Sequence, residues 1–370
     1  YEYGAQDNKF SFMFIGDDND NTGNLAIRLA YTNYTDLKLI FSIPDNGWVD
    51  RNYTYYKYRD EWFQNPNREN GSIPIFMGLG NHDIEVPEAV DYAVKTQGPI
   101  LSSSLPGMIK FREGPYDVYP AHGDYEDRNL TYSFDYKNAH FVMLNAYYHD
   151  INLCSPGDLS CDRLSGIYTP RACLHNETLD WLEQDLNSTR AIHKFLFFHE
   201  GAYPAPGGRH TGDSFDDLNC PGNYVPQSCI NSSRPMRDKF WNMLAKYNVT
   251  ATFVGHAHHT TVTWAMDPYN QYKPVYEGEP GPPSNTAIVT IDEDKATLRL
   301  YYYNLIGNNR IYYELFTPLE LSKISNEQNQ APRLFLHDGG NEVGYPPISK
   351  RDFEFEVDRT PSFLYFEAKD

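Results

Sequence analysis

The stretch "IPIFMGLGNHD", from Ile73 to Asp83, decides the fold. Its first half is apolar and long enough for a short buried strand, and Pro74 suits the start of such a strand. The strand runs through two glycines into Asn81, His82 and Asp83, whose side chains carry hydrogen-bonding and metal-binding atoms. Taken alone, this ending is equally well interpreted as a turn. A buried strand that ends in such residues is also typical of the ligand-binding edge of an α/β sheet.

The same pattern recurs at four other apolar strands. "FMFIG" precedes Asp17, "IFSIP" precedes Asp45, "FLFF" precedes His199, and "TFVG" precedes His256 and His258. Any one of these residues has a plainer interpretation as a turn, a helix cap or a hydrogen-bonded core histidine. Because the carboxyl ends of strands converge at one edge of an α/β sheet, the whole set favours a single pocket. Its oxygen and nitrogen atoms suffice for two divalent metals about 3.5–4 Å apart.

The acidic stretch "DDNDN" after the first strand raises the alternative of a calcium loop. An EF-hand that starts at Asp17 needs glycine where Thr22 stands and glutamate where Arg28 stands. One that starts at Asp18 gains a glycine but ends on Leu29 instead of glutamate. Both registers fail, so Asp17 is a candidate ligand through its place after a buried strand.

The remaining chain alternates between short apolar strands and amphipathic helices, which is the pattern of an α/β domain. Two hairpins are predicted, one turning at Lys137-Asn138 and one at Glu293-Asp294. One large α/β domain is expected over 1–320, followed by a C-terminal extension over 321–370 that shows no clear domain of its own. Strands are expected at 9–15, 37–43, 73–80, 193–201 and 249–259, helices at 22–34, 176–186 and 232–247, and loops at 200–233 and 266–285.

The composition bounds the function. The 370 residues are 40% hydrophobic and 22% charged, which predicts a folded globule. A net charge of −19 argues against a nucleic-acid-binding surface. An anionic substrate would therefore need a locally positive site, which a metal pair provides. No apolar run approaches the roughly 18 residues of a transmembrane segment.

Several features predict an extracellular or secretory-pathway location of the eukaryotic type. The chain begins at Tyr1, which fits a processed mature protein. In an oxidising compartment the five cysteines suggest Cys154–Cys161 and Cys220–Cys229 disulfides with Cys173 left over, although sequence does not establish this pairing. N-linked glycans are expected at several of the eight sequons, which start at Asn33, Asn52, Asn70, Asn129, Asn176, Asn187, Asn231 and Asn248.

The polar strand ends resemble the motifs of the calcineurin-like metallophosphoesterases. The family pattern of D-x-H, G-D, G-N-H-D/E, a lone His and G-H-x-H is similar here to "GDDN", "PDN", "GNHD", "FFHEG" and "GHAH". "GNHD" and "GHAHH" are the specific parts, and the resemblance covers roughly residues 9 to 305. It implies a four-layer αββα sandwich, in which two mixed β-sheets are flanked by helices.

The resemblance also implies a dinuclear metal centre above the sheet edges. One metal would be held by Asp17, Asp45 and His258. The other would be held by Asp45, Asn81, His199 and His256, with Asp45 bridging the two. The carboxylate, amide and imidazole ligands suit two divalent ions of Mn, Fe, Zn or Mg. His82 would stabilise the transition state or protonate the leaving oxygen, and Asp83 either orients that imidazole or is a turn residue.

Two departures from the family pattern bear on the metals. Asn19 stands where the family has a histidine ligand, so an amide oxygen would replace an imidazole nitrogen. This change lowers the expected affinity and shifts the preference away from Zn. Trp48 stands where the purple acid phosphatase branch has a metal-binding tyrosine, so a purple iron site is not expected.

The leading hypothesis is a secreted, glycosylated, metal-dependent phosphoesterase that hydrolyses phosphomonoesters or phosphodiesters through a dinuclear centre and a bridging hydroxide. The alternative is a catalytically weakened protein of the same fold that serves as an extracellular structural or surface glycoprotein. Self-association is compatible with either interpretation. A calcium-stabilised adhesive protein is a third interpretation, and it rests only on the acidic stretch.

Overall fold

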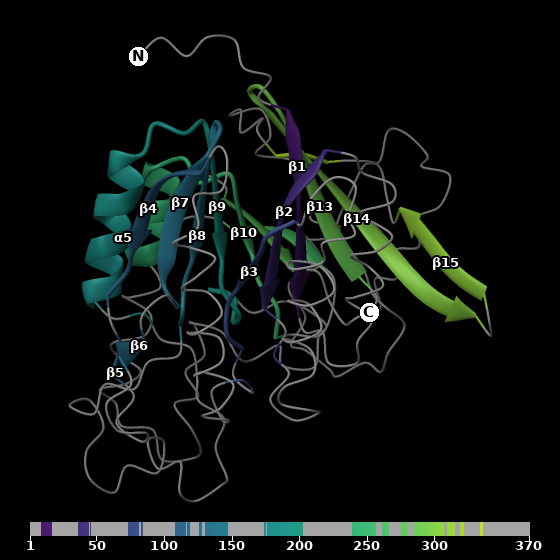
Figure 1. Ribbon diagram of the computed structural model, residues 1–370, viewed down its shortest axis with the longest axis horizontal. Helices are drawn as coiled ribbons and strands as arrows, with labels where there is room; N and C mark the ends of the chain where they lie inside the picture. Colours follow the sequence, from purple (N-terminus) through teal and green to yellow (C-terminus); the bar gives the residue numbers. More distant parts are fainter. Residues whose placement is uncertain are drawn as a thin grey trace, which may run out of the picture.

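The computed structural model shows two β-sheets packed face to face, with helices on the outer face of one of them (Figure 1). The structure describes part of the chain. The described residues are 9–16, 36–43, 45, 73–80, 83, 108–115, 117–118, 126–127, 130–146, 174, 176–202, 239–256, 261–265, 275–279, 285–306, 309–314, 319–321 and 334–335.

The first sheet has the strand order β15-β14-β13-β1-β2-β3, and β16 pairs with β14. Strands β1, β2 and β3 are parallel, and β13 joins β1 in antiparallel register. The sheet is therefore mixed. Its strands are β1 (Phe10–Gly16), β2 (Leu37–Ile43), β3 (Ile75–Met77), β13 (Asn285–Asp292), β14 (Lys295–Ile306), β15 (Asn309–Glu314) and β16 (Leu319–Glu320).

The second sheet has the order β17-β11-β12-β10-β9-β8-β7-β4 and is also mixed. Strands β8, β9, β10 and β12 are parallel, whereas β4, β7 and β11 pair antiparallel. A separate two-stranded sheet joins β5 (Asp117–Val118) to β6 (Glu126–Asp127). The second sheet contains β4 (Met108–Glu113), β7 (Tyr132–Tyr136), β8 (Ala139–Met143), β9 (His193–Phe197), β10 (Ala251–Phe253), β11 (Thr261–Ala265), β12 (Val275–Glu279) and β17 (Leu334–Phe335).

Alternation along the strands of the second sheet builds two cores. In β9, Phe195 and Phe197 point toward the first sheet, while Leu196 points the other way. Successive side chains of a strand lie on opposite faces, so each strand supplies both cores. The core between the sheets is dominated by phenylalanine, and Phe41 stacks on Phe197 with ring centroids 4.0 Å apart.

The outer core lies between the second sheet and two helices. Helix α5 (Asn176–Ser188) and a helical segment at 239–246 cover this face, and Trp241 is fully buried there. The first sheet is covered on both faces as well, because Met13 and Ile15 are fully buried although they point away from the inter-sheet core. The predicted sandwich of two mixed sheets is thus confirmed, and the helix predicted at 22–34 lies outside the described residues.

Most predicted elements are found where they were expected. Both hairpins turn at the predicted residues, Lys137-Asn138 and Glu293-Asp294. The loop prediction for 266–285 is wrong in part, because β12 lies within it and pairs with both β10 and β11. Of the predicted C-terminal extension, the described strand β17 pairs with β11. The division into 1–320 and 321–370 stays a prediction, and all five cysteines lie outside the described residues.

No helix in the described part of the chain is long and apolar enough to cross a membrane.

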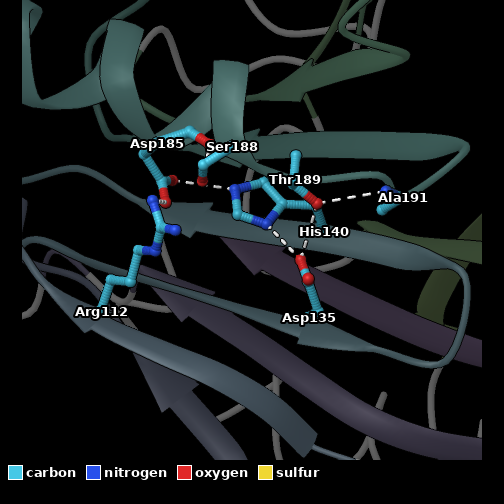
Figure 2. A network of polar contacts seen from close by, with 7 residues as sticks. All are labelled: Arg112, Asp135, His140, Asp185, Ser188, Thr189 and Ala191. Atoms are coloured by element: carbon cyan, nitrogen blue, oxygen red, sulfur yellow. Dashed lines mark hydrogen bonds and ion pairs between the residues drawn. The ribbon is translucent and has the colours of Figure 1, made fainter. Parts of the chain in front are cut away.

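A buried ionic network fastens α5 to the second sheet (Figure 2). The His140 ring on β8 lies between two carboxylates, with Nδ1 2.6 Å from Asp135 on β7 and Nε2 2.9 Å from Asp185 on α5. Arg112 on β4 donates to the other oxygen of Asp185, and the Thr189 hydroxyl donates to Asp135. Since β8 and β9 are parallel and His140 is level with Lys194, this network lies at the end of the sheet opposite the carboxyl end of β9.

Candidate metal centre

The carboxyl ends of the central strands bring buried ligand-type side chains together. Asp45 follows β2 in the first sheet, His199 follows β9 in the second, and His256 follows β10 beside it. The exposed fraction of these residues is 1%, 1% and 6%, respectively. Charged and polar groups are buried in proteins when they are paired or coordinate metals, so their burial needs an explanation of this kind.

Asp45 and His199 meet across the two sheets. The Oδ2 atom of Asp45 lies 3.3 Å from the Nε2 atom of His199. Two donors bound to one tetrahedral metal, with bonds of about 2.0–2.2 Å, are separated by about 3.3–3.6 Å. The carboxylate and the imidazole are therefore spaced as two ligands of one cation would be. Their oxygen and nitrogen donors also match the chemistry of Zn, Mn and Fe sites.

His256 lies close to the same cluster. Its ring centroid is 5.1 Å from that of His199, with an angle of 73° between the ring planes. Backbone hydrogen bonds hold the two segments together, since Phe198 N donates to Phe253 O and Gly255 N donates to His199 O. The two histidines are therefore positioned by the pairing of β9 with β10, which continues beyond the ends of both strands.

The backbone is strained at two of these residues. Asp45 has φ of 48° and His256 has φ of 74°, both in the left-handed region that side chains with a Cβ rarely adopt. Asp and His tolerate this region better than branched residues. Such conformations persist only where the surrounding structure imposes them, and they cluster at functional sites.

Gly80 and Asp83 shape the turn after β3. The Oδ2 atom of Asp83 accepts a hydrogen bond of 2.9 Å from Gly80 N, and Asp83 is fully buried. A Cβ placed on Gly80 would lie 2.5 Å from the Cβ of Asp45 and 2.6 Å from its Cγ. The glycine is thus what allows the β3 turn to approach Asp45, and the described contact of Asp83 is that of a turn residue.

Sequence reasoning missed Glu200, the residue after His199. Its side chain is 4% exposed, and Oε1 lies 3.4 Å from the Nε2 atom of His256. In "FFHEG" the histidine follows a buried strand and matches the predicted ligand pattern. The glutamate beside it has no place in that pattern, so the sequence alone does not mark it. Only the contact with His256, which is 56 residues further along the chain, identifies Glu200 as part of the site.

Five predicted metal ligands or catalytic residues lie outside the described residues. Within the part of the chain that the structure describes, no group of three or more His, Cys, Asp or Glu side chains is placed so that it could hold a metal ion. The structure places His199 next to both Asp45 and His256, and the rest of the predicted set stays a sequence-based prediction. The residues outside the description are Asp17, Asn19, Asn81, His82 and His258.

Comparison with known proteins agrees with the predicted resemblance. The family model described as calcineurin-like phosphoesterase matches residues 12–260, which is more than half of the 370 residues. The matched range includes the strand ends after β1, β2, β3, β9 and β10. A search of curated proteins finds no match.

Solved structures are similar to this chain at low sequence identity. The structure of PhoD is 12% identical, with a TM-score of 0.47 over 86% of this chain and 72% of its own. GAP50, described as the anchor in the inner membrane complex of Plasmodium, is 11% identical with a TM-score of 0.44 over 83% and 88%. Purple acid phosphatase PPD1 from yellow lupin (Lupinus luteus) seeds is 14% identical with a TM-score of 0.48 over 81% and 52%.

Proposed function

The chain belongs to the calcineurin-like phosphoesterase family, and from this premise we propose that it is a metal-dependent hydrolase of phosphomonoesters or phosphodiesters. One observation carries the proposal. Asp45 from the first sheet and His199 from the second lie 3.3 Å apart with both side chains buried. A carboxylate and an imidazole at this spacing, at the end of two buried strands, form a preorganised half of a cation site.

The proposed ligand set combines these residues with the sequence-based ones. A bound pair of divalent cations supplies an acidified water as nucleophile and positive charge for the phosphate oxygens. That charge also offsets the net charge of −19, which would otherwise repel an anionic ester. We assign metal binding to Asp17, Asn19, Asp45, Asn81, His199, His256 and His258.

The protein's own side chains have two further tasks. His82 follows the proposed ligand Asn81 and is assigned the donation of a proton to the leaving oxygen, a role that contributes typically 10²–10⁴-fold. Gly80 and Asp83 flank this histidine in the sequence, and the Asp83 carboxylate accepts a hydrogen bond from Gly80 N. The buried Asp45 carboxylate has two oxygens that can bind cations. Among the described residues, it is the candidate metal ligand of the first sheet that contacts the second sheet.

Two measurements test the proposed function. The metal content of the full chain is determined, and turnover of p-nitrophenyl phosphate and of its bis-ester is measured with added Mn, Zn, Fe or Mg. We expect two bound metals, metal-dependent turnover, and a loss of at least about 100-fold in His82→Ala. Ile192→Ala, at a side chain that is 58% exposed, should retain full activity.

The same measurements distinguish the enzyme from the structural alternative. Absence of turnover with every metal, or equal turnover in wild type and His82→Ala, would contradict the enzyme. One bound metal or none would favour a scaffold protein that has retained the fold without the chemistry.

We also propose that the protein is a secreted glycoprotein. Among the sequons with a described asparagine side chain, Asn187 on α5 and Asn248 after the 239–246 helix are both exposed, as attachment of a glycan requires. Peptide mass spectrometry after enzymatic deglycosylation in ¹⁸O water should show Asn converted to labelled Asp at both positions. Unmodified Asn187 and Asn248 in protein from a eukaryotic secretory host would contradict this assignment.

A further inference from the structure

A buried carboxylate outside the proposed ligand set lies against one of its histidines. Glu200 is 3% exposed and His256 is 6% exposed. The Oε1 atom of Glu200 lies 3.4 Å from Nε2 of His256. An ionised carboxylate is costly to bury unless a partner compensates the lost hydration, so this contact accounts for part of the burial.

The contact is imposed by the backbone. Gly255 N donates to His199 O at 2.8 Å, which places the residues after β10 beside those after β9. Glu200 follows His199 and His256 follows Gly255, so the pairing brings the two side chains to the same edge. The left-handed backbone of His256, with φ of 74°, then sets the direction in which its ring leaves the chain.

Both histidines present Nε2 to an acidic neighbour, but only one of these neighbours is a proposed metal ligand. His199 has Nε2 beside the Asp45 carboxylate, which is a proposed metal ligand. His256 has Nε2 beside Glu200, which is not. In a neutral imidazole one nitrogen carries the proton and the other carries the lone pair. A carboxylate beside Nε2 favours the proton on that nitrogen, and the lone pair then resides on Nδ1.

We propose that Glu200 is a positioning residue that accepts the Nε2 proton of His256 and so directs the Nδ1 lone pair toward a divalent cation. The inference rests on the proposed function, since it requires that this edge of the sheets bind a metal. Histidine ligands commonly donate their second ring N–H to a carboxylate, and loss of that partner typically costs 10- to 100-fold in metal affinity. His199 has a different arrangement, so the two histidines would bind through different nitrogens.

A direct ligand role for Glu200 makes a different prediction. If its carboxylate bound the cation itself, neutralising it would remove a ligand and one equivalent of metal would be lost. If it acts only through His256, the number of bound metals is unchanged and the affinity falls. Glutamine at this position keeps a carbonyl oxygen that can accept the same proton, whereas alanine cannot.

The test compares Zn²⁺ binding by the full chain in wild type, Glu200→Gln and Glu200→Ala. Equilibrium dialysis with metal analysis should give equal stoichiometry in all three, with affinity reduced about 10- to 100-fold in Glu200→Ala and less in Glu200→Gln. Glu183→Gln is the matched control, because its carboxylate lies on α5 and pairs with Lys246 instead of a histidine. It should bind Zn²⁺ as wild type does.

A second readout uses the wild-type protein alone. Labelling histidine with ¹⁵N and loading Zn²⁺ should show His256 with a metal-bound Nδ1 and a protonated Nε2, and His199 with a metal-bound Nε2. Metal on Nε2 of His256, unchanged affinity in both Glu200 variants, or loss of one equivalent of Zn²⁺ would each overturn the positioning role while leaving the proposed function intact. Wild type that binds no divalent cation would overturn both.

Discussion

Asp45 shows how much of the site depends on single residues. It combines a left-handed backbone, near-complete burial and a contact with the opposite sheet. A glycine at position 80 makes this placement possible, because any Cβ there would overlap the Asp45 side chain. Even a small side chain at Gly80 should therefore displace Asp45.

Gly80→Ala should weaken metal binding by at least about tenfold. The added Cβ would lie 2.5 Å from the Cβ of Asp45, so one of the two segments must shift and move the carboxylate away from His199. Overpacking of this kind typically costs about 1–3 kcal/mol in stability. Zn²⁺ affinity is measured by equilibrium dialysis, and the free energy of unfolding by denaturant titration.

Gly78→Ala is the matched control for this substitution. Its new Cβ would meet the Sδ atom of Met143 at 2.6 Å, and a thioether end can move aside more easily than a packed carboxylate. It should reduce stability without reducing Zn²⁺ affinity. Equal Zn²⁺ affinity in Gly80→Ala and wild type would show that Asp45 does not depend on the glycine.

At the scale of elements, we expect the attachment of α5 to the second sheet to depend on pH. Burial alone would lower the pKa of His140, but the hydrogen bonds to Asp135 and Asp185 outweigh it and hold the pKa above its ordinary value of about 6.5. Among the described residues, Arg112 from β4 pairs with Asp185, and Lys194 on β9 interacts electrostatically with Asp135. The charged imidazole therefore compensates two buried acids that come from different elements.

The contribution of His140 to stability should be lost as pH rises. Because its pKa is higher in the folded than in the unfolded state, the stabilisation is complete below about pH 6.5 and disappears as pH rises through the folded value. His140→Asn should cost about 3–5 kcal/mol at pH 6, since it leaves Asp135 and Asp185 without the buried cation. The difference between variant and wild type should shrink toward pH 9 in denaturant titrations.

His193 provides a control, because its contribution to stability should change with pH in the opposite direction. Burial lowers its pKa, although its Nε2 donates to the carbonyl of Glu293. Wild type therefore loses stability at this site as pH falls through about 6.5, and His193→Gln removes that loss. A pH-independent difference between wild type and His140→Asn would contradict a charged His140 in the folded protein.

At the scale of the whole molecule, the site exists because the two sheets stack. Asp45 belongs to one sheet and His199 to the other, and the phenylalanine core between the sheets sets their separation. Phe41 is central to that core, with its ring stacked on Phe197 at an interplanar angle of 6° and on Phe141 with centroids 5.0 Å apart. Phe41 and Asp45 are only four residues apart, on β2 and just after it.

Phe41→Ala should lower the free energy of unfolding by about 3–5 kcal/mol, because a buried aromatic side chain is replaced by a cavity. We also expect weaker Zn²⁺ binding, since β2 loses its packing against β9 just before Asp45. Denaturant titration and equilibrium dialysis measure the two effects. Ile192→Ala, on an exposed side chain, should change the free energy of unfolding by no more than about 0.5 kcal/mol.

The sequence by itself determined the strands that end in polar residues and the two hairpin turns. These features are local. An apolar run predicts a buried strand, and the residues of a tight turn predict that turn. It also determined the family, through "GNHD" and "GHAH" and their order along the chain. The two strands inside or beside Gly-rich and Pro-rich stretches, β11 and β12, were not predicted.

Only the tertiary structure decided which of these local features meet. β12 is a strand because β10 and β11 pair with it, although its sequence "VYEGE" lies in a turn-rich window. Glu200 acquires its proposed role from His256, and His140 is held by Asp185, which lies 45 residues further along the chain. Contacts between residues far apart in the chain leave no periodic signal in the sequence. They are set by sheet order, register and packing, which the whole chain determines together.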